Sequence, residues 1–397
     1  MAELTPTLCT VCARPLPAPL LDFGLQPPAN RFLGASAMGD EALYPLSLGA
    51  CAHCGTAQLV GRMPLEAVRP RLDGLRNNEP EGHLDALVAA IAALPDVSPA
   101  ARIGGLSYKD ESTLARFATH GHADTRLLDL TSELPSGGGV ESIAALLSGD
   151  EACRRLREHG GAFDLLIVRH VIEHTESARA FLLGLRELLR PGGQLVVEIP
   201  DNARIFRNAH HAFVWEEHCS YFTETSLRRL AAGVGARVTW FARYPYAYED
   251  ALVAVLRFDA EPNDAPVDSD AELLSFAARF AGARARWQAE LQALRAQGER
   301  IAVFGAGHLA VKWINFLQLG AWVDCVVDDH PAKCGLRMPG SHLPILPTAT
   351  LLEQGIRTCI STLSPESEQR VRPRLGEYFA RGGRLLPAFP LPPECDA

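Results

Sequence analysis

The most constraining feature of the chain is a regular alternation of strand-like and helix-like segments between residues 101 and 199. Parallel strands need a crossover connection, usually a helix, whereas antiparallel strands can be joined by a tight turn. The alternation therefore predicts a parallel, doubly wound α/β sheet. We expect strands at 101–105, 126–130, 164–168 and 194–199, helices at 81–94, 112–118, 141–158 and 177–190, and a turn at 136–139.

A second α/β unit is predicted toward the end of the chain. An apolar strand at 300–304 runs into the turn Gly305-Ala306-Gly307, and further strands are expected at 323–328 and 358–362. A helix rich in Ala, Arg, Leu and Gln is expected over 269–298. This helix would serve as a connector or as an oligomer surface, which leaves a homodimer open.

Length and charge narrow the functional class. At 397 residues the chain is long enough for two or three domains. Its net charge of −9 argues against a nucleic-acid surface, which needs a basic stripe. No apolar run has the length of a membrane span, and the first residues lack the charged and apolar regions of a signal peptide. We therefore expect a cytoplasmic enzyme that acts on a small molecule, without nucleic-acid or membrane partners.

Four of the ten cysteines form two C-x-x-C pairs near the N-terminus, namely Cys9 with Cys12 and Cys51 with Cys54. Each pair can place two thiolates on one tetrahedral zinc ion. A redox pair or chance would explain a single C-x-x-C, but two pairs favour zinc. Because all four ligands would be sulfur, no coordination position stays open, and the predicted ion is structural. We expect a strand-and-turn module around it at residues 1–70.

The segment from Trp215 to Phe222 is the strongest candidate for chemistry. It follows the predicted strand 194–199, and open α/β sheets bind ligands outside the carboxyl ends of their strands. Glu217 lies beside His218, and Tyr221 follows three residues later. A carboxylate, an imidazole and a phenol supply what general acid–base catalysis needs. The alternative is a polar loop whose side chains only satisfy backbone groups.

A second group of polar residues follows the strand at 164–168. His170, Glu173 and His174 would lie at the same carboxyl edge of the sheet. Two histidines four residues apart also suggest a metal site, but the H-E-x-x-H order of zinc hydrolases is absent. We therefore favour a reaction site without a catalytic metal.

Two glycine turns are candidates for binding a nucleotide-like cofactor. In such units a Gly-rich turn follows the first strand and an acid closes the second. Gly104-Gly105 and Asp129 offer this pattern in the middle of the chain, and Gly305-Ala306-Gly307 and Asp328 offer it near the end. Glycines also serve ordinary strand-to-helix turns, so each signal is weak, and an NAD-linked alternative stays open.

Together these segments resemble the sugar C-methyltransferase family, which uses S-adenosylmethionine to methylate carbon in nucleotide-linked keto-deoxysugars. The resemblance covers essentially the whole chain. Its motifs here are the paired C-x-x-C with 23–30, His174 after the fourth strand, 217–222 after the fifth, and 304–307, 327–333 and 339–345 near the end. The chain departs from the family in having Trp215 where a Tyr is usual and Glu249 within a segment that usually reads His-Gly-Gly. Its donor loop, 102–110, is longer than the family's and lacks the preceding acid.

The resemblance implies three parts: a zinc-binding module at 1–70, a Rossmann-like class I methyltransferase domain at 71–258, and a Rossmann-like α/β domain with its connecting helix at 259–397. It implies that a base removes the proton beside a C4 ketone and that the resulting enolate carbon takes the methyl group. The expected catalytic residues are His218 as base, Glu217, His174 and Tyr221. The expected donor-binding residues are Gly104, Gly105, Asp129 and His170. Another acceptor, or an NAD-linked or non-catalytic protein, remains the alternative.

Overall fold

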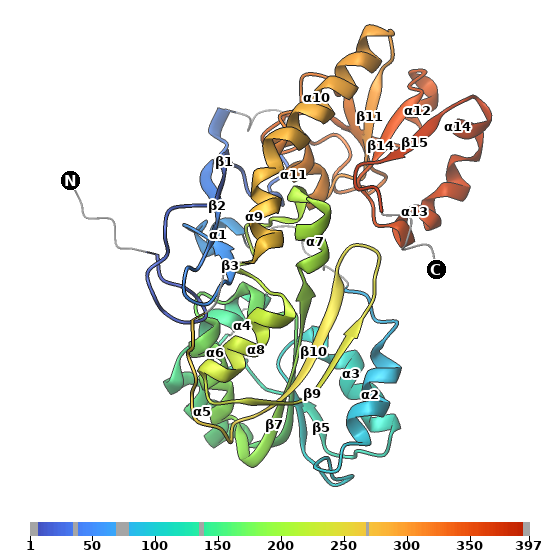
Figure 1. Ribbon diagram of the computed structural model, residues 1–397. Helices are drawn as coiled ribbons and strands as arrows, with labels where there is room; N and C mark the ends of the chain where they lie inside the picture. Colours follow the sequence, from blue (N-terminus) through green and yellow to red (C-terminus); the bar gives the residue numbers. More distant parts are fainter. Residues whose placement is uncertain (1–6, 35–38, 69–78, 135–138, 267–269, 392–397) are drawn as a thin grey trace.

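The computed structural model describes residues 7–34, 39–68, 79–134, 139–266 and 270–391, which form three β-sheets with surrounding helices (Figure 1). The six-stranded sheet lies at the bottom of Figure 1, and the N-terminal and C-terminal sheets lie above it. No helix within these residues is long and apolar enough to cross a membrane. The turn expected at 136–139 falls outside them except for Gly139, and the domain boundaries at 70 and 258 remain predictions.

The middle of the chain forms the predicted α/β sheet. Its strands lie in the order β5 (Thr125–Leu127), β4 (Ile103–Gly105), β6 (Phe163–Arg169), β7 (Leu189–Asp201), β10 (Asp250–Arg257) and β9 (Arg237–Tyr244). The first four strands are parallel. Successive side chains of β6 point to opposite faces: Leu165 and Ile167 belong to one buried cluster, and Leu166 and Val168 to the other.

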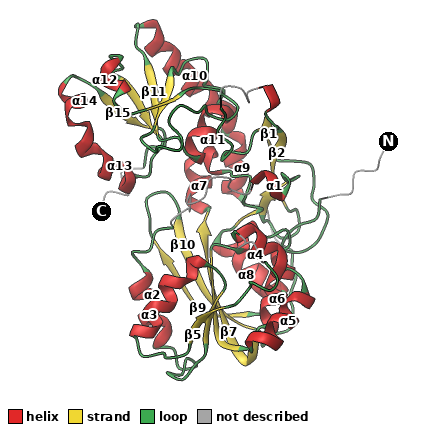
Figure 2. Ribbon diagram, turned by 180° about the vertical axis from the view of Figure 1, so that it is seen from behind, coloured by secondary structure: helices red, strands yellow, loops and turns green. Residues whose placement is uncertain are grey.

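Helices cover both faces of this sheet (Figure 2). One face carries α2 (Leu84–Ala92) and α3 (Glu111–Thr119). The other carries α4 (Val140–Leu147), α5 (Asp150–Gly160), α6 (Ala178–Glu187) and α8 (Glu224–Gly233). This two-sided cover buries both faces of β6 and of the second half of β7, which explains why these stretches are mostly apolar.

The structure corrects three details of the expected fold. The sheet is not wholly parallel, because β10 runs antiparallel to both β7 and β9; residues 245–249 join β9 to β10 as a hairpin, which only antiparallel strands allow. The helix expected at 141–158 is two helices, since Gly149 has an extended backbone between them. The helix expected at 269–298 is also two, α9 (Ala271–Ala278) and α10 (Phe280–Ala296), with Arg279 between them.

The N-terminal sheet contains a strand from the middle of the chain. Its order is β1 (Leu21–Gln26), β2 (Tyr44–Ala50), β3 (Ala57–Leu59) and β8 (Ser220–Tyr221), and all neighbours are antiparallel. The short helix α1 (Leu65–Val68) follows β3. Because β8 belongs to the segment predicted to carry chemistry, the N-terminal module holds that segment directly.

The C-terminal sheet is wholly parallel, in the order β13 (Ile345–Leu346), β12 (Cys325–Val327), β11 (Ile301–Phe304), β14 (Thr358–Ser361) and β15 (Arg384–Pro387). Its helices are α11 (His308–Phe316), α12 (Thr350–Glu353), α13 (Pro365–Val371) and α14 (Gly376–Ala380). One apolar cluster runs from this domain into the N-terminal module. Within it, the ring of Phe23 stacks on Phe316 at 4.1 Å and meets Phe280 edge-on at 5.1 Å.

Candidate active site and zinc centre

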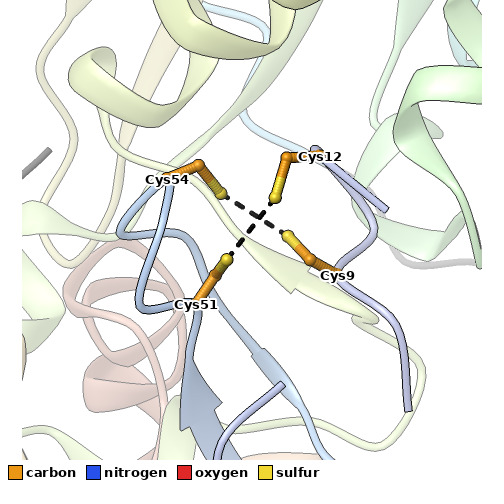
Figure 3. Close-up of side chains that lie close together, drawn as sticks. All are labelled: Cys9, Cys12, Cys51 and Cys54. Atoms are coloured by element: carbon orange, nitrogen blue, oxygen red, sulfur yellow. Dashed lines mark hydrogen bonds between the residues drawn. The ribbon is translucent and has the colours of Figure 1, made fainter. Parts of the chain in front are cut away.

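The four paired cysteines converge on one point (Figure 3). The Sγ atoms of Cys9 and Cys54 are 3.5 Å apart, as are those of Cys12 and Cys51, and all four residues are buried. Tetrahedral Zn–S bonds of about 2.3 Å place sulfur atoms roughly 3.8 Å apart, so these thiols fit a zinc ion. The set is closed, which suits a structural ion.

The zinc knuckle also contacts the segment that carries His218. The hydroxyl of Thr10, which lies between Cys9 and Cys12, is 2.7 Å from the hydroxyl of Ser220. The backbone N–H of Thr10 donates to the side chain of Gln58, whose strand pairs with β8. The metal site therefore fixes one side of the candidate active site.

Gly104 and Gly105 close β4, as expected, but the protein itself explains why they are glycines. A Cβ on Gly104 would lie 2.6 Å from the ring of Phe163, and one on Gly105 would lie 2.7 Å from the Cβ of Asp110. Both contacts are closer than real Cβ atoms approach. The turn thus packs against β6 and the following helix whether or not a ligand is bound.

Asp110 shapes the loop that follows these glycines. Its fully buried carboxylate accepts hydrogen bonds from the backbone N–H groups of Leu106, Ser107 and Arg169 at 2.8 to 3.0 Å. Burial raises the pKa of Asp110 to about 6 despite these bonds. The loop is therefore tied to the end of β6. The spacing Ser107-x-x-Asp110 forms a capping box, which is the sequence signal that points to this residue.

Asp129 lies two residues beyond β5, at the same edge of the sheet as the loop. It is exposed, and its carboxylate accepts hydrogen bonds from the N–H and hydroxyl of Thr131 at 2.9 and 2.6 Å. These bonds lower the pKa of Asp129. An ionised, accessible carboxylate at this place suits the hydroxyl groups of a ribose.

His170 ends β6 in a left-handed backbone conformation, with φ at +52°. Its Nε2 is 3.1 Å from Glu198, and its Nδ1 is 3.4 Å from Glu173. Burial opposes a charge on this imidazole, but the carboxylates of Glu79, Glu173 and Glu198 outweigh burial and raise the pKa of His170 to about 10. His170 is therefore a fixed cation at neutral pH.

Glu198 is the centre of a buried ionic network. Arg169, itself 1% exposed, binds both carboxylate oxygens at 2.7 and 3.1 Å, and His83 lies 3.3 Å away. These partners and His170 hold the pKa of Glu198 well below its usual range against the opposing effect of burial. Next to this network, the Nζ of Lys109 lies 2.6 Å from Glu79.

His174 and His218 meet beside Glu173, the carboxylate that also faces Nδ1 of His170. Their rings pack edge-on, with centroids 4.8 Å apart. A ring nitrogen of each histidine lies within 4.8 Å of a carboxylate oxygen of Glu173. Burial lowers the pKa of His218, and burial together with His218 holds the pKa of His174 well below its usual value. Both imidazoles are thus neutral at neutral pH, the form in which histidine accepts a proton.

The two glutamates before His218 make contacts that the sequence alone does not indicate. Glu217 pairs with His308 of α11, with Nε2 and Oε1 2.8 Å apart, so its closest partner is not His218. Glu216 pairs with Lys312 one turn further along α11, at 2.5 Å, and accepts a hydrogen bond from the backbone N–H of Ala29. The loop is therefore held from both the C-terminal domain and the N-terminal module.

Tyr221 is almost fully buried in β8. Its hydroxyl donates to the carbonyl of Trp215 and accepts from the N–H of the same residue, both at 2.8 Å. These two bonds close the loop from Trp215 to Tyr221 and engage the phenol within the protein. The ring of Trp215 lies 5.1 Å from that of His218.

Comparison with known proteins gives the class. Three family models match consecutive parts of the chain: a zinc binding domain at 9–68, a methyltransferase domain at 104–239, and a C-methyltransferase C-terminal domain at 235–392. The C-methyltransferase NovU of Streptomyces niveus is 24% identical over 363 residues, covering 85% of this chain and 84% of NovU. The chain is therefore a methyltransferase with a structural zinc site.

Solved structures resemble the chain only in part. The 1,6-didemethyltoxoflavin-N1-methyltransferase of Burkholderia thailandensis is 15% identical, with 45% of this chain and 77% of that chain covered at a TM-score of 0.30. The magnesium protoporphyrin IX methyltransferase of Synechocystis is 12% identical, with 44% and 80% covered at a TM-score of 0.30. With TM-scores this low, nothing about this chain is inferred from these structures. The three domain models follow one another along the chain, and the similarity to the C-methyltransferase NovU spans most of both chains.

Proposed function

We propose that this C-methyltransferase acts on a nucleotide-linked keto-deoxysugar and methylates a carbon next to the ketone. The observation that carries this proposal is the buried pair of neutral imidazoles, His174 and His218, beside Glu173. A carbon acid next to a ketone must lose a proton before it can accept a methyl group, and a neutral imidazole is a suitable base for that step.

In this proposal His218 removes the proton, and the electron pair of the broken C–H bond becomes an enolate. His174, whose Nδ1 lies 3.7 Å from Glu141 and makes no hydrogen bond, would contact the acceptor's oxygen. Glu173 stabilises the imidazolium that forms on His218. Tyr221, expected to polarise the substrate, instead shapes the loop, because both hydrogen-bonding functions of its hydroxyl are engaged by Trp215.

The donor would lie over the carboxyl ends of β4, β5 and β6. Asp129 would hold the ribose hydroxyls, and the turn at Gly104 and Gly105 would border the donor. His170 follows β6 and carries a positive charge, but its two ring nitrogens already face Glu198 and Glu173, so it would act on the donor's methionine part through its charge alone. When bound, S-adenosylmethionine supplies an electrophilic methyl group.

Substitution of His218 tests this assignment. His218→Ala should lower the rate of methyl transfer to a thymidine-diphosphate-linked 4-keto-6-deoxyglucose by about two to four powers of ten, the usual cost of losing a general base. Affinity for S-adenosylhomocysteine, measured by calorimetry, should stay near wild type because His218 acts on the acceptor. A variant that keeps its methyl-transfer rate would move the base elsewhere, with His174 the next candidate.

A further inference from the structure

The C-terminal domain contacts residues 215–222, which we call the reaction loop, through the first turns of α11. His308, the first residue of this helix, places Nε2 2.8 Å from Oε1 of Glu217, and its ring lies 5.4 Å from that of Trp215. Trp215 in turn contacts the ring of His218. His308 is thus two contacts away from the proposed base, although one histidine begins α11 and the other lies in the loop before β8.

The neighbouring pair on the same helix is a fully buried ion pair whose two facing atoms make no hydrogen bond. Glu216 and Lys312 have fully buried side chains and face each other at 2.5 Å, and the second oxygen of Glu216 accepts from the N–H of Ala29. This pair therefore has a structural role, which is to dock α11 on the loop.

Glu217 differs, because only one of its oxygens has a partner. Its side chain is 7% exposed, and Oε2 is buried without a hydrogen bond. A buried carboxylate oxygen without a donor is costly and is normally satisfied by protein, water or ligand. His308 holds Glu217 through Oε1, so the side chain is fixed while Oε2 stays without a partner.

We propose that His308 is a positioning residue for the acceptor: it holds Glu217 so that the free carboxylate oxygen accepts a hydrogen bond from a hydroxyl or amino group of the acceptor. The inference rests on the proposed function and names a part of the acceptor that this protein recognises. It also assigns a role to the turn Gly305-Ala306-Gly307, which starts α11 at the point where His308 contacts the reaction loop. The acid expected to serve a cofactor there, Asp328, accepts instead from the N–H of Ala306 at 2.8 Å.

Kinetics of the full-length enzyme with thymidine-diphosphate-linked 4-keto-6-deoxyglucose test the inference. His308→Ala should raise the KM for this acceptor by about tenfold or more, the scale for a misplaced hydrogen bond to a charged group, and leave the KM for S-adenosylmethionine within twofold. His308→Gln keeps an N–H donor and should recover most of the loss. Adding Glu217→Gln to His308→Ala should make the KM no worse than Glu217→Gln alone, because the two residues act as one unit.

The chain offers a matched control. His342 of the C-terminal domain pairs with Glu41 of the N-terminal module, also at 2.8 Å, but away from the reaction loop. His342→Ala removes a similar histidine–glutamate pair of the C-terminal domain, one that joins it to the N-terminal module instead of the reaction loop, and should leave both KM values unchanged. An equal rise in acceptor KM for His342→Ala would show that domain docking is responsible and would overturn the inference.

Two further outcomes distinguish a failure of the inference from a failure of the proposed function. An active wild type whose acceptor KM is unaffected by His308→Ala overturns the inference alone. A wild type that binds S-adenosylmethionine but methylates no keto-sugar overturns the proposed function, and the inference falls with it.

Discussion

His170 carries a charge that the two other histidines near it do not. Three carboxylates surround it, whereas burial and mutual proximity keep His174 and His218 neutral. Sequence order alone could point to His174 and His218 as candidates, because both follow strands that end at one sheet edge. It could not assign the charge of His170, since this depends on Glu198 and Glu79, which come from other parts of the chain.

The charge on His170 makes stability depend on pH in the alkaline range. Its folded pKa of about 10 lies above the usual histidine value of about 6.5. Its contribution is therefore fully present below pH 6.5 and is lost as pH rises toward 10. Asn tolerates the positive φ at this position. The free energy of unfolding of His170→Asn should differ most from that of wild type at pH 6.5, and this difference should shrink by on the order of 2 to 4 kcal/mol by pH 10.

Urea unfolding at several pH values measures this effect. Wild type and variant should converge as pH rises, because the wild type loses what the variant already lacks. A constant difference from pH 6.5 to 10 would mean that His170 is not charged in the folded protein.

At the scale of elements, the loop after β4 is organised by the protein and not only by its ligand. Gly104 packs on Phe163, and Asp110 ties the loop to β6. The order of strands and helices from 101 to 199 followed from the hydrophobic pattern. The hairpin of β9 and β10 and the breaks at Gly149 and Arg279 did not, because tertiary packing decides them.

This view predicts a cost for a methyl group at Gly104 even without a ligand. Gly104→Ala should destabilise the free protein by about 1 to 3 kcal/mol, the usual cost of overpacking. Gly307→Ala is a suitable control, since its Cβ would have no atom within 4 Å and its φ is −127°. Thermal unfolding without donor compares the two. If both variants were equally stable, packing against Phe163 would not explain why position 104 is a glycine. Only contact with a bound ligand would then explain it.

At the scale of the whole molecule, three parts meet at the reaction loop. The zinc module contributes β3 and Thr10, the methyltransferase domain contributes the loop itself, and the C-terminal domain contributes His308 and Lys312. The paired cysteines and the family resemblance predicted the parts. The contacts between them, such as Glu217 with His308, join residues distant in sequence and leave no local pattern.

Loss of zinc should therefore affect catalysis at a distance. Cys51→Ser should bind less than one zinc per chain by metal analysis and should lower methyl transfer, because β3 no longer supports β8. Its affinity for S-adenosylhomocysteine should stay near wild type, since the donor loop lies on the other sheet. A metal-free variant with full activity would show that the reaction loop does not depend on the zinc module.

Proton exchange tests the central claim most directly, because it needs no methyl donor. In deuterated water, the wild type should exchange the proton beside the ketone of thymidine-diphosphate-linked 4-keto-6-deoxyglucose, followed by NMR, and His218→Ala should not. Exchange that survives the substitution would contradict the role of His218. Absence of exchange in the wild type, on this and related keto-sugars, would contradict the keto-sugar assignment and point to a different acceptor.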